Sequence, residues 1–185
     1  NSSAASDVYK RQPLHHETYD GVVDYYGRPY TLTKSMILHK QIALRTVPRI
    51  FAFSPNVRME PEERAPLRRY LAEFVQLDLE VRDATRDEIM EIGEGLFIAV
   101  VKAVRDNCAP ELESLGRELE VPRAPFARIA YQDAVKRFGE HYDEPLSASL
   151  SAPAWLINFP REVREFYDRE DPDRPGILLD MDLIY

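Results

Sequence analysis

The chain has 185 residues, a formal net charge of −8 at pH 7, 44% hydrophobic residues and one cysteine. This length is enough for one sizeable core, while the negative charge argues against a broad phosphate-contacting surface and the single cysteine excludes an internal disulfide framework. With no apolar run near the roughly 20 residues that span a bilayer and no visible signal peptide, we expect a cytoplasmic protein without a membrane partner.

Residues 1–12 (NSSAASDVYKRQ) are rich in Ser and Ala and show no period. We interpret them as a non-native or disordered tail, and residues 13–185 as one partial domain. Two β-rich runs on either side of Gly27 predict a hairpin within residues 22–33. Ser35 is placed to cap the helix that follows, and Pro48 ends it.

Residues 50–60 and 70–81 alternate as two strands around a charged loop. On the first strand one face carries Ile50, Ala52, Ser54, Asn56, Arg58 and Glu60. On the second, Leu71, Val75, Leu77, Leu79 and Val81 face one way, and Tyr70, Phe74, Gln76, Asp78 and Glu80 face the other. The alternation predicts an apolar, buried face and a polar, functional or wet face.

Thr85 and Glu88 form a capping box that opens a long amphipathic helix ending near Cys108. Short helices are expected at 111–119 and 133–138, and strands at 155–159, 163–167 and 177–184. This order predicts an α+β fold, with an antiparallel sheet of six or more strands flanked by helices, and not a series of βαβ units.

The two alternating strands carry the most chemistry. If they pair as an antiparallel hairpin, Arg58 and Glu60 share one face with Phe74, Gln76 and Asp78. A guanidinium binds phosphate or carboxylate oxygens, a carboxylate accepts from an amino group, and a phenyl ring stacks on a purine. These parts can hold ATP beside an amino acid. A solvent-facing strand pair also produces cross-strand ion pairs, and periodicity alone favours that plainer interpretation.

The residues of four segments shift this balance. NVRME followed by RRYLAEFVQLDLEV resembles motif 2 of class II aminoacyl-tRNA synthetases, in particular the aspartate/asparagine subgroup. LTKSMILHKQ, ARIAYQDAVKRF and NFPREVREFYDREDP resemble further segments of that subgroup in the same order. The resemblance implies a class II synthetase-like core, incomplete at both ends here, with ATP and Mg²⁺ as cofactors and a homodimer at full length.

The resemblance also implies roles for individual residues. For the nucleotide, Arg58 would be the catalytic group on the α-phosphate, Glu60 would accept from the adenine amino group, Phe74 would stack on adenine, and Arg69 or its neighbour Arg68 would hold the terminal phosphate. For the amino acid, the implied contacts are Ser35 and Asp78 with the ammonium, Lys40 with the side-chain carboxylate, and Gln76 with the ribose or α-carboxylate. Asp182 would be a magnesium ligand, and Arg164 would support the site from a neighbouring strand.

Three functions remain open at this point. Lys40 suits aspartate as substrate, although it can also be a solvated helix lysine. KSMILHK, DREDPDRPG and DMDLIY resemble most closely the archaeal-type asparagine synthetases related to asparaginyl-tRNA synthetase, in which aspartate is adenylated and ammonia attacks to give asparagine. We place this interpretation ahead of an aspartate/asparagine–tRNA ligase. A non-catalytic paralogue is the third interpretation, and the retained Arg58, Glu60 and Phe74 argue against it.

Departures from the subgroup pattern affect the site. Ile37 stands where the subgroup has a substrate-binding glutamine, and Tyr70 stands where it has a phosphate-contacting histidine. Motif 1, the second magnesium carboxylate and the motif 3 arginine would lie outside these residues. We therefore expect the chain to be inactive alone.

Overall fold

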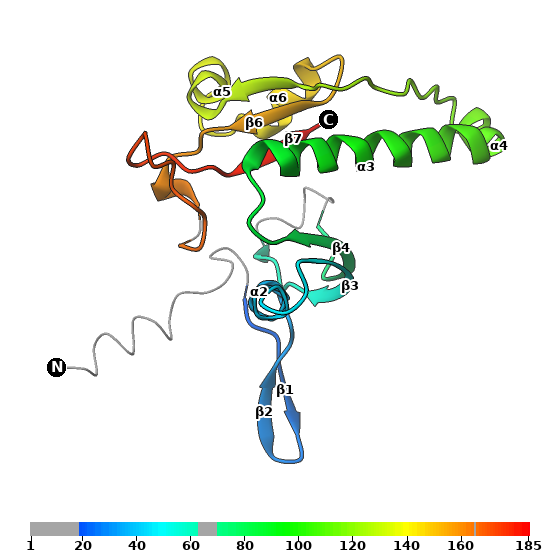
Figure 1. Ribbon diagram of the computed structural model, residues 1–185. Coiled ribbons are helices and arrows are strands. Elements are labelled where there is room, and N and C mark those ends of the chain that lie inside the picture. Colours follow the sequence, from blue (N-terminus) through cyan, green and yellow to red (C-terminus); the bar gives the residue numbers. More distant parts are fainter. Residues whose placement is uncertain (1–18, 63–69, 165) are drawn as a thin grey trace. The chain divides into compact units, whose positions relative to one another are not determined.

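The computed structural model describes residues 19–62, 70–164 and 166–185. The chain divides into two compact units, Asn1–Asp83 and Ala84–Tyr185, which are described separately. Figure 1 shows the elements of each unit in chain order. No helix in the described ranges is long and apolar enough to cross a membrane.

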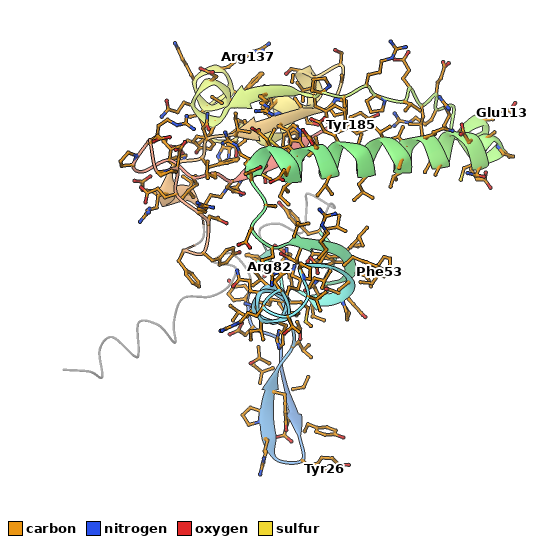
Figure 2. All side chains as sticks on the ribbon, viewed as in Figure 1. Tyr26, Phe53, Arg82, Glu113, Arg137 and Tyr185 are labelled. Atoms are coloured by element: carbon orange, nitrogen blue, oxygen red, sulfur yellow. The ribbon has the colours of Figure 1, made fainter. Side chains whose placement is uncertain are left out.

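The first unit opens with the predicted hairpin. Strands β1 (Val22–Tyr25) and β2 (Arg28–Thr31) pair antiparallel. The turn between them places Tyr26 at φ 52° and Gly27 at φ 72°, the positive values that a tight two-residue hairpin turn requires. Figure 2 shows Tyr26 at the tip of this hairpin, where the residue is 87% exposed.

A short helix and a second hairpin complete the first unit. Helix α2 spans Ile37–Ala43, so it ends before the Pro48 expected to stop it. Strands β3 (Arg49–Val57) and β4 (Glu73–Val81) pair antiparallel, from Arg49 opposite Val81 to Val57 opposite Glu73. This register confirms the pairing predicted from the alternating pattern.

The exposure of the β3–β4 hairpin differs from the prediction. The apolar face, expected to be buried, is exposed: Phe51 and Phe53 are each 68% exposed and Val75 is 64% exposed. The polar face is the half-buried one, and Ser54 and Asn56 on it are 2% and 1% exposed. The reason is that α2 and the segment before it contact the polar side, through ion pairs to β4 and a hydrogen bond beyond the end of β3.

The second unit begins with the long helix. Helix α3 (Arg86–Asn107) starts at the predicted capping box, in which the Thr85 side chain accepts from the Glu88 amide and the Glu88 carboxylate accepts from the Thr85 amide. The short helix α4 (Ala109–Ser114) follows. Both lie close to the positions predicted from the sequence.

A three-stranded sheet with helices on both faces forms the rest of this unit. Its elements are β5 (Ala127–Ala130), α5 (Tyr131–Phe138), α6 (Asp143–Ser149), β6 (Ala154–Ile157), the 3-10 helix η2 (Arg161–Val163) and β7 (Met181–Ile184). The strand order is β5-β6-β7, with β5 parallel and β7 antiparallel to the central β6.

Strand β6 is buried on both faces, so the core lies on either side of it. Trp155 packs with Met90 and Phe126 on the α3 side. Leu156 packs with Ala134 of α5 and with Leu146, Phe159 and their neighbours on the other side. The apolar composition of this strand therefore reflects its central place in a layered unit.

The α+β class with mainly antiparallel pairing is confirmed, but several strand predictions need correction. The described strands form three separate sheets of two, two and three strands, not one sheet of six or more. The strand predicted at 163–167 is not found among the described residues of that segment, which begins at the last residue of η2 (Arg161–Val163). Within 177–184 only Met181–Ile184 is a strand, because the preceding turns are organised by the Asp171 carboxylate, which accepts from the Asp173 amide and from Arg174.

Candidate functional site

The polar face of the β3–β4 hairpin gathers most of the residues expected to bind substrate. The register sets Asn56 opposite Phe74, Ser54 opposite Gln76, and Ala52 opposite Asp78. Because side chains alternate along a strand, Phe74, Gln76 and Asp78 project on the same side. They therefore form a row along β4, as the sequence predicted.

Arg58 and Phe74 meet at one end of this row. The Arg58 backbone amide donates to the Ala72 carbonyl at 2.8 Å, which continues the hairpin beyond β3. Its guanidinium carbon lies 5.1 Å from the centre of the Phe74 ring, within the range of a cation–π contact. The Arg58 Nε donates to the Lys34 carbonyl at 3.2 Å, so the segment before α2 helps to orient the guanidinium.

Lys40 of α2 forms a charged cluster with two carboxylates of β4 at the other end of the row. Its Nζ lies 2.8 Å from Asp78 Oδ1 and 2.7 Å from Glu80 Oε1. The three side chains are 13%, 14% and 25% exposed. Lys40 is thus a largely buried, doubly paired cation and not the solvated helix lysine that was the plainer alternative.

The pKa values in this cluster favour the charged forms. Burial by itself raises the pKa of Asp78, but the hydrogen bond from Lys40 and the charges of Lys40 and Arg58 outweigh it, so the pKa falls below its ordinary value. Burial by itself lowers the pKa of Lys40, but Asp78 and Glu80 together raise it. Both groups are therefore ionised across the neutral range.

The remaining nucleotide and amino-acid residues have different placements. Glu60 lies beyond the end of β3 and is half-buried. The Ser35 hydroxyl accepts from the Ile37 amide at 3.2 Å, but the N-cap of α2 is Met36, so Ser35 does not have the capping position expected for it. Arg69, with its neighbour Arg68, lies outside the described residues. The roles of all these residues stay predictions.

Arg164 and Asp182 belong to the second unit and contact each other. The sequence predicted that Arg164 would lie on a strand. Instead, Arg164 directly follows η2. Its Nε lies 2.8 Å from Asp180 Oδ2, and a terminal nitrogen pairs with Asp182. The guanidinium carbon lies 3.7 Å from the centre of the Phe159 ring. Burial lowers the pKa of Arg164, but Asp182 and Asp180 raise it above its ordinary value.

This pairing bears on the magnesium prediction. Within the described ranges, no group of three or more histidine, cysteine, aspartate or glutamate side chains could hold a metal ion. Asp182 and Asp180 share the Arg164 cation, and the role of Asp182 as a magnesium ligand stays a prediction. The described residues therefore do not form a magnesium site by themselves.

Two buried residues of the first unit, Asn56 on the polar face and Lys34 before α2, had no role assigned from the sequence. Asn56 is 1% exposed, and its Nδ2 donates to Gln76 Oε1 at 2.8 Å. Lys34 is buried and pairs with Asp20 at 2.6 Å. The alternating pattern placed Asn56 on the correct face, but only the strand register reveals its contact with Gln76.

Comparison with known proteins identifies the family to which this chain belongs. The family model described as tRNA synthetases class II (D, K and N) matches residues 3–185. The aspartate–tRNA(Asp/Asn) ligase of Methanothermobacter thermautotrophicus is 29% identical over 177 residues, which cover 88% of this chain and 40% of that protein. The asparagine–tRNA ligase of Lactococcus lactis subsp. cremoris is 29% identical over 185 residues, covering 87% of this chain and 41% of that protein.

Solved structures agree on the fold. Asparaginyl-tRNA synthetase from Entamoeba histolytica aligns with a TM-score of 0.80 at 21% identity, covering 92% of this chain and 42% of that one. The Pyrococcus horikoshii enzyme complexed with asparaginyl-adenylate aligns with a TM-score of 0.78 at 22% identity, covering 91% and 42%. The chain spans about 40% of the length of the curated relatives it matches, and it belongs to the class II tRNA synthetase family of the D, K and N group.

Proposed function

We propose that the protein activates aspartate or asparagine with ATP, as an aminoacyl-adenylate, and transfers the aminoacyl group to tRNA. The single observation that carries this proposal is the row on β4 with the Arg58 guanidinium 5.1 Å from the centre of the Phe74 ring at one end and the Lys40–Asp78–Glu80 cluster at the other. A group that binds phosphate and a ring that stacks on a base thus share one face with an anionic cluster.

The nucleotide end of the row supplies charge and stacking. Arg58 would bind the α-phosphate while a carboxylate oxygen of the amino acid attacks the phosphorus in line and pyrophosphate leaves. A fixed guanidinium stabilises the negative charge that develops on the phosphoryl oxygens. Phe74 offers its ring to the adenine. The reaction needs positioning and charge neutralisation more than side-chain acid–base chemistry.

The cluster end of the row suits the ammonium of the amino acid. Asp78 and Glu80 carry two negative charges against the one positive charge of Lys40, so this end is net negative. A net negative, half-buried cluster attracts a substrate cation. Two carboxylates already pair with Lys40. Its predicted contact with a substrate carboxylate therefore requires one of these ion pairs to break, or the Lys40 side-chain ammonium to pair with the substrate as well.

The names of the relatives support a choice of acceptor in the second step. The Methanothermobacter and Lactococcus proteins are both named as tRNA ligases, which supports tRNA over the ammonia predicted from the sequence. Neither of these two proteins is named as an asparagine synthetase. Transfer to ammonia therefore becomes the alternative that the experiment must separate.

The experiment uses the complete protein that contains this chain, with ATP and labelled aspartate or asparagine, and either tRNA or ammonium as acceptor. We expect ATP–pyrophosphate exchange that depends on one amino acid, and a labelled ester on tRNA. Asparagine formed from aspartate without RNA would contradict the tRNA step and identify the ammonia-using alternative. ATP binding without exchange would identify a non-catalytic paralogue.

The chain by itself serves as a further arm of that experiment. It spans about 40% of the curated relatives, and we expect it to show no exchange. Exchange catalysed by the chain alone would contradict the prediction that these 185 residues are insufficient.

A further inference from the structure

Asn56 occupies a position on β3 where burial and hydrogen bonding are unusually well defined. Its side chain is 1% exposed. Its Nδ2 donates to the Ser54 backbone carbonyl at 2.9 Å and to Gln76 Oε1 at 2.8 Å. Both contacts lie on the polar face of the hairpin, between Phe74 and Asp78 of β4.

These two hydrogen bonds determine which way each amide points. A backbone carbonyl can only accept, so the Asn56 atom beside the Ser54 carbonyl must be the amino group. That amino group also contacts Gln76, so the Gln76 atom facing it must be the carbonyl oxygen. The amino group of Gln76 is therefore the end turned away from Asn56, and no hydrogen bond to it is found among the described residues.

The side-chain oxygen of Asn56 argues against a purely structural role for this residue. Its Oδ1 is buried without a hydrogen-bond partner in the described part of the chain. Buried polar atoms are normally paired, and an apolar residue would fill this place without an unpaired acceptor. A purely structural role leaves that cost unexplained, whereas the orientation of Gln76 gives Asn56 a function.

We infer that Asn56 is a positioning residue that fixes Gln76 with its amino group presented as a hydrogen-bond donor to an anionic oxygen of the substrate. This inference rests on the proposed function. Gln76 stands between the Phe74 end and the Asp78 end of the row, where the amino-acid carboxylate meets the α-phosphate. A donor held in place strengthens that contact, while a reversed amide would turn its carbonyl oxygen toward the same anionic group.

The test is a double-mutant cycle in ATP–pyrophosphate exchange with the complete protein. Gln76→Ala is expected to lower kcat/KM about tenfold, the effect of losing one hydrogen bond to a charged group. Asn56→Ala should lower kcat/KM by up to the same factor. Asn56→Asp should lower it further than Asn56→Ala does, because a carboxylate at position 56 would bind the Gln76 amino group and reverse the amide. In the Gln76→Ala background, Asn56→Ala should change nothing further.

Controls separate positioning from folding. Asn107→Ala, at the exposed end of α3 where the side chain donates only to the Ala103 carbonyl, should leave exchange unchanged. Melting temperatures of all variants are measured in parallel. If Asn56→Ala folds poorly, Asn56→Thr replaces it in the cycle, since threonine suits a strand but supplies no amino group.

The outcomes distinguish the two proposals. Exchange by the wild type with non-additive effects of Asn56 and Gln76 supports the inference. Exchange by the wild type with additive effects overturns the inference alone and makes Asn56 a structural residue. Absence of exchange in the complete wild-type protein overturns the proposed function and, with it, the reaction that Asn56 was inferred to serve.

Discussion

The two units of the chain bury different kinds of side chain. Within the described ranges, the hydrophobic side chains of the core run from Met90 to Leu178, all in the unit Ala84–Tyr185. In the first unit the buried side chains are Lys34, Ser54 and Asn56. Burying apolar area stabilises a fold directly, whereas burying polar groups costs free energy unless their partners are fixed.

This difference assigns the units different tasks. The second unit is a scaffold built around β6, with apolar side chains on both faces. The first unit holds a polar set in place with ion pairs and hydrogen bonds. Substitutions in the first unit should therefore change activity more than stability, and substitutions in the core of the second should do the reverse.

The largest expected effect is on catalysis by Arg58. Arg58→Ala removes the cation proposed to stabilise the transition state, and we expect amino-acid-dependent exchange by the complete protein to fall about 100- to 1000-fold. The melting temperature should change little. Arg28→Ala, on the exposed β1–β2 hairpin, is the matched control. Near-normal exchange by Arg58→Ala would remove Arg58 from the catalytic machinery.

The next effect is on the stability of the second unit. Glu94 of α3 is 6% exposed, and its Oε1 accepts from Trp155 Nε1 at 2.9 Å and from the Phe126 amide at 3.0 Å. Glu94→Ala leaves two buried donors unpaired, and we expect a loss of about 3 kcal/mol in the free energy of unfolding.

Glu94→Gln is the control for that prediction, because its side-chain oxygen can still accept both hydrogen bonds. It should cost about 1 kcal/mol or less. Denaturant unfolding of the two variants tests the pair. Equal stability of the alanine and glutamine variants would show that these hydrogen bonds do not stabilise the scaffold.

A smaller effect is expected for the ionic cluster of the first unit. Lys40→Met leaves Asp78 and Glu80 side by side without their shared cation. We expect a loss of about 2 kcal/mol, less than the roughly 3–5 kcal/mol typical of a broken, fully buried pair, because the carboxylates are 14% and 25% exposed. Unfolding of the variant and the wild type in the same buffer measures the difference.

The pH dependence of that difference identifies its cause. The lowered pKa of Asp78 contributes stability above the unfolded value of about 3.9, and this is lost as pH falls through the folded value. The raised pKa of Lys40 contributes stability below about 10.4, lost as pH rises through the folded value. The stability gap between wild type and Lys40→Met should therefore narrow at both extremes. A gap that is constant with pH would point to lost packing and not to lost charge pairing.

The smallest expected effect is on nucleotide affinity. Phe74→Ala removes a base-stacking surface, and we expect ATP to bind about tenfold more weakly, at the low end of measured base–aromatic stacking. Phe53→Leu is the matched control, because Phe53 pairs with Leu77 and lies on the opposite, apolar face of the same hairpin, where it is 68% exposed. Calorimetric titration with ATP compares the two variants.

Local patterns in the sequence predicted much of the fold. The Gly27 hairpin, the Thr85–Glu88 capping box and the pairing of residues 50–60 with 70–81 are properties of neighbouring residues, and the structure has all three. The strand expected at 177–184 was too long, because the turns around Asp171 that precede Met181–Ile184 involve contacts that short-range periodicity does not describe. Likewise, alternation identified the two faces of β3–β4 but not which one α2 covers.

The site was predicted as a set of residues on one face, not as a set of contacts. Arg58 and Phe74 were expected together, and they are in contact. The double pairing of Lys40 could not be predicted, because it depends on how α2 packs against β4. Asn56 was placed on the correct face without a role, since the register that brings its amino group to Gln76 is a long-range property.

A crystal structure of the complete protein with a non-hydrolysable ATP analogue tests the account most directly. We expect the base against the Phe74 ring and the α-phosphate within hydrogen-bond distance of the Arg58 guanidinium, with the Lys40–Asp78–Glu80 cluster at the amino-acid end. A nucleotide bound elsewhere, with both side chains free of contact to it, would contradict the claim that the polar face of β3–β4 is the activation site.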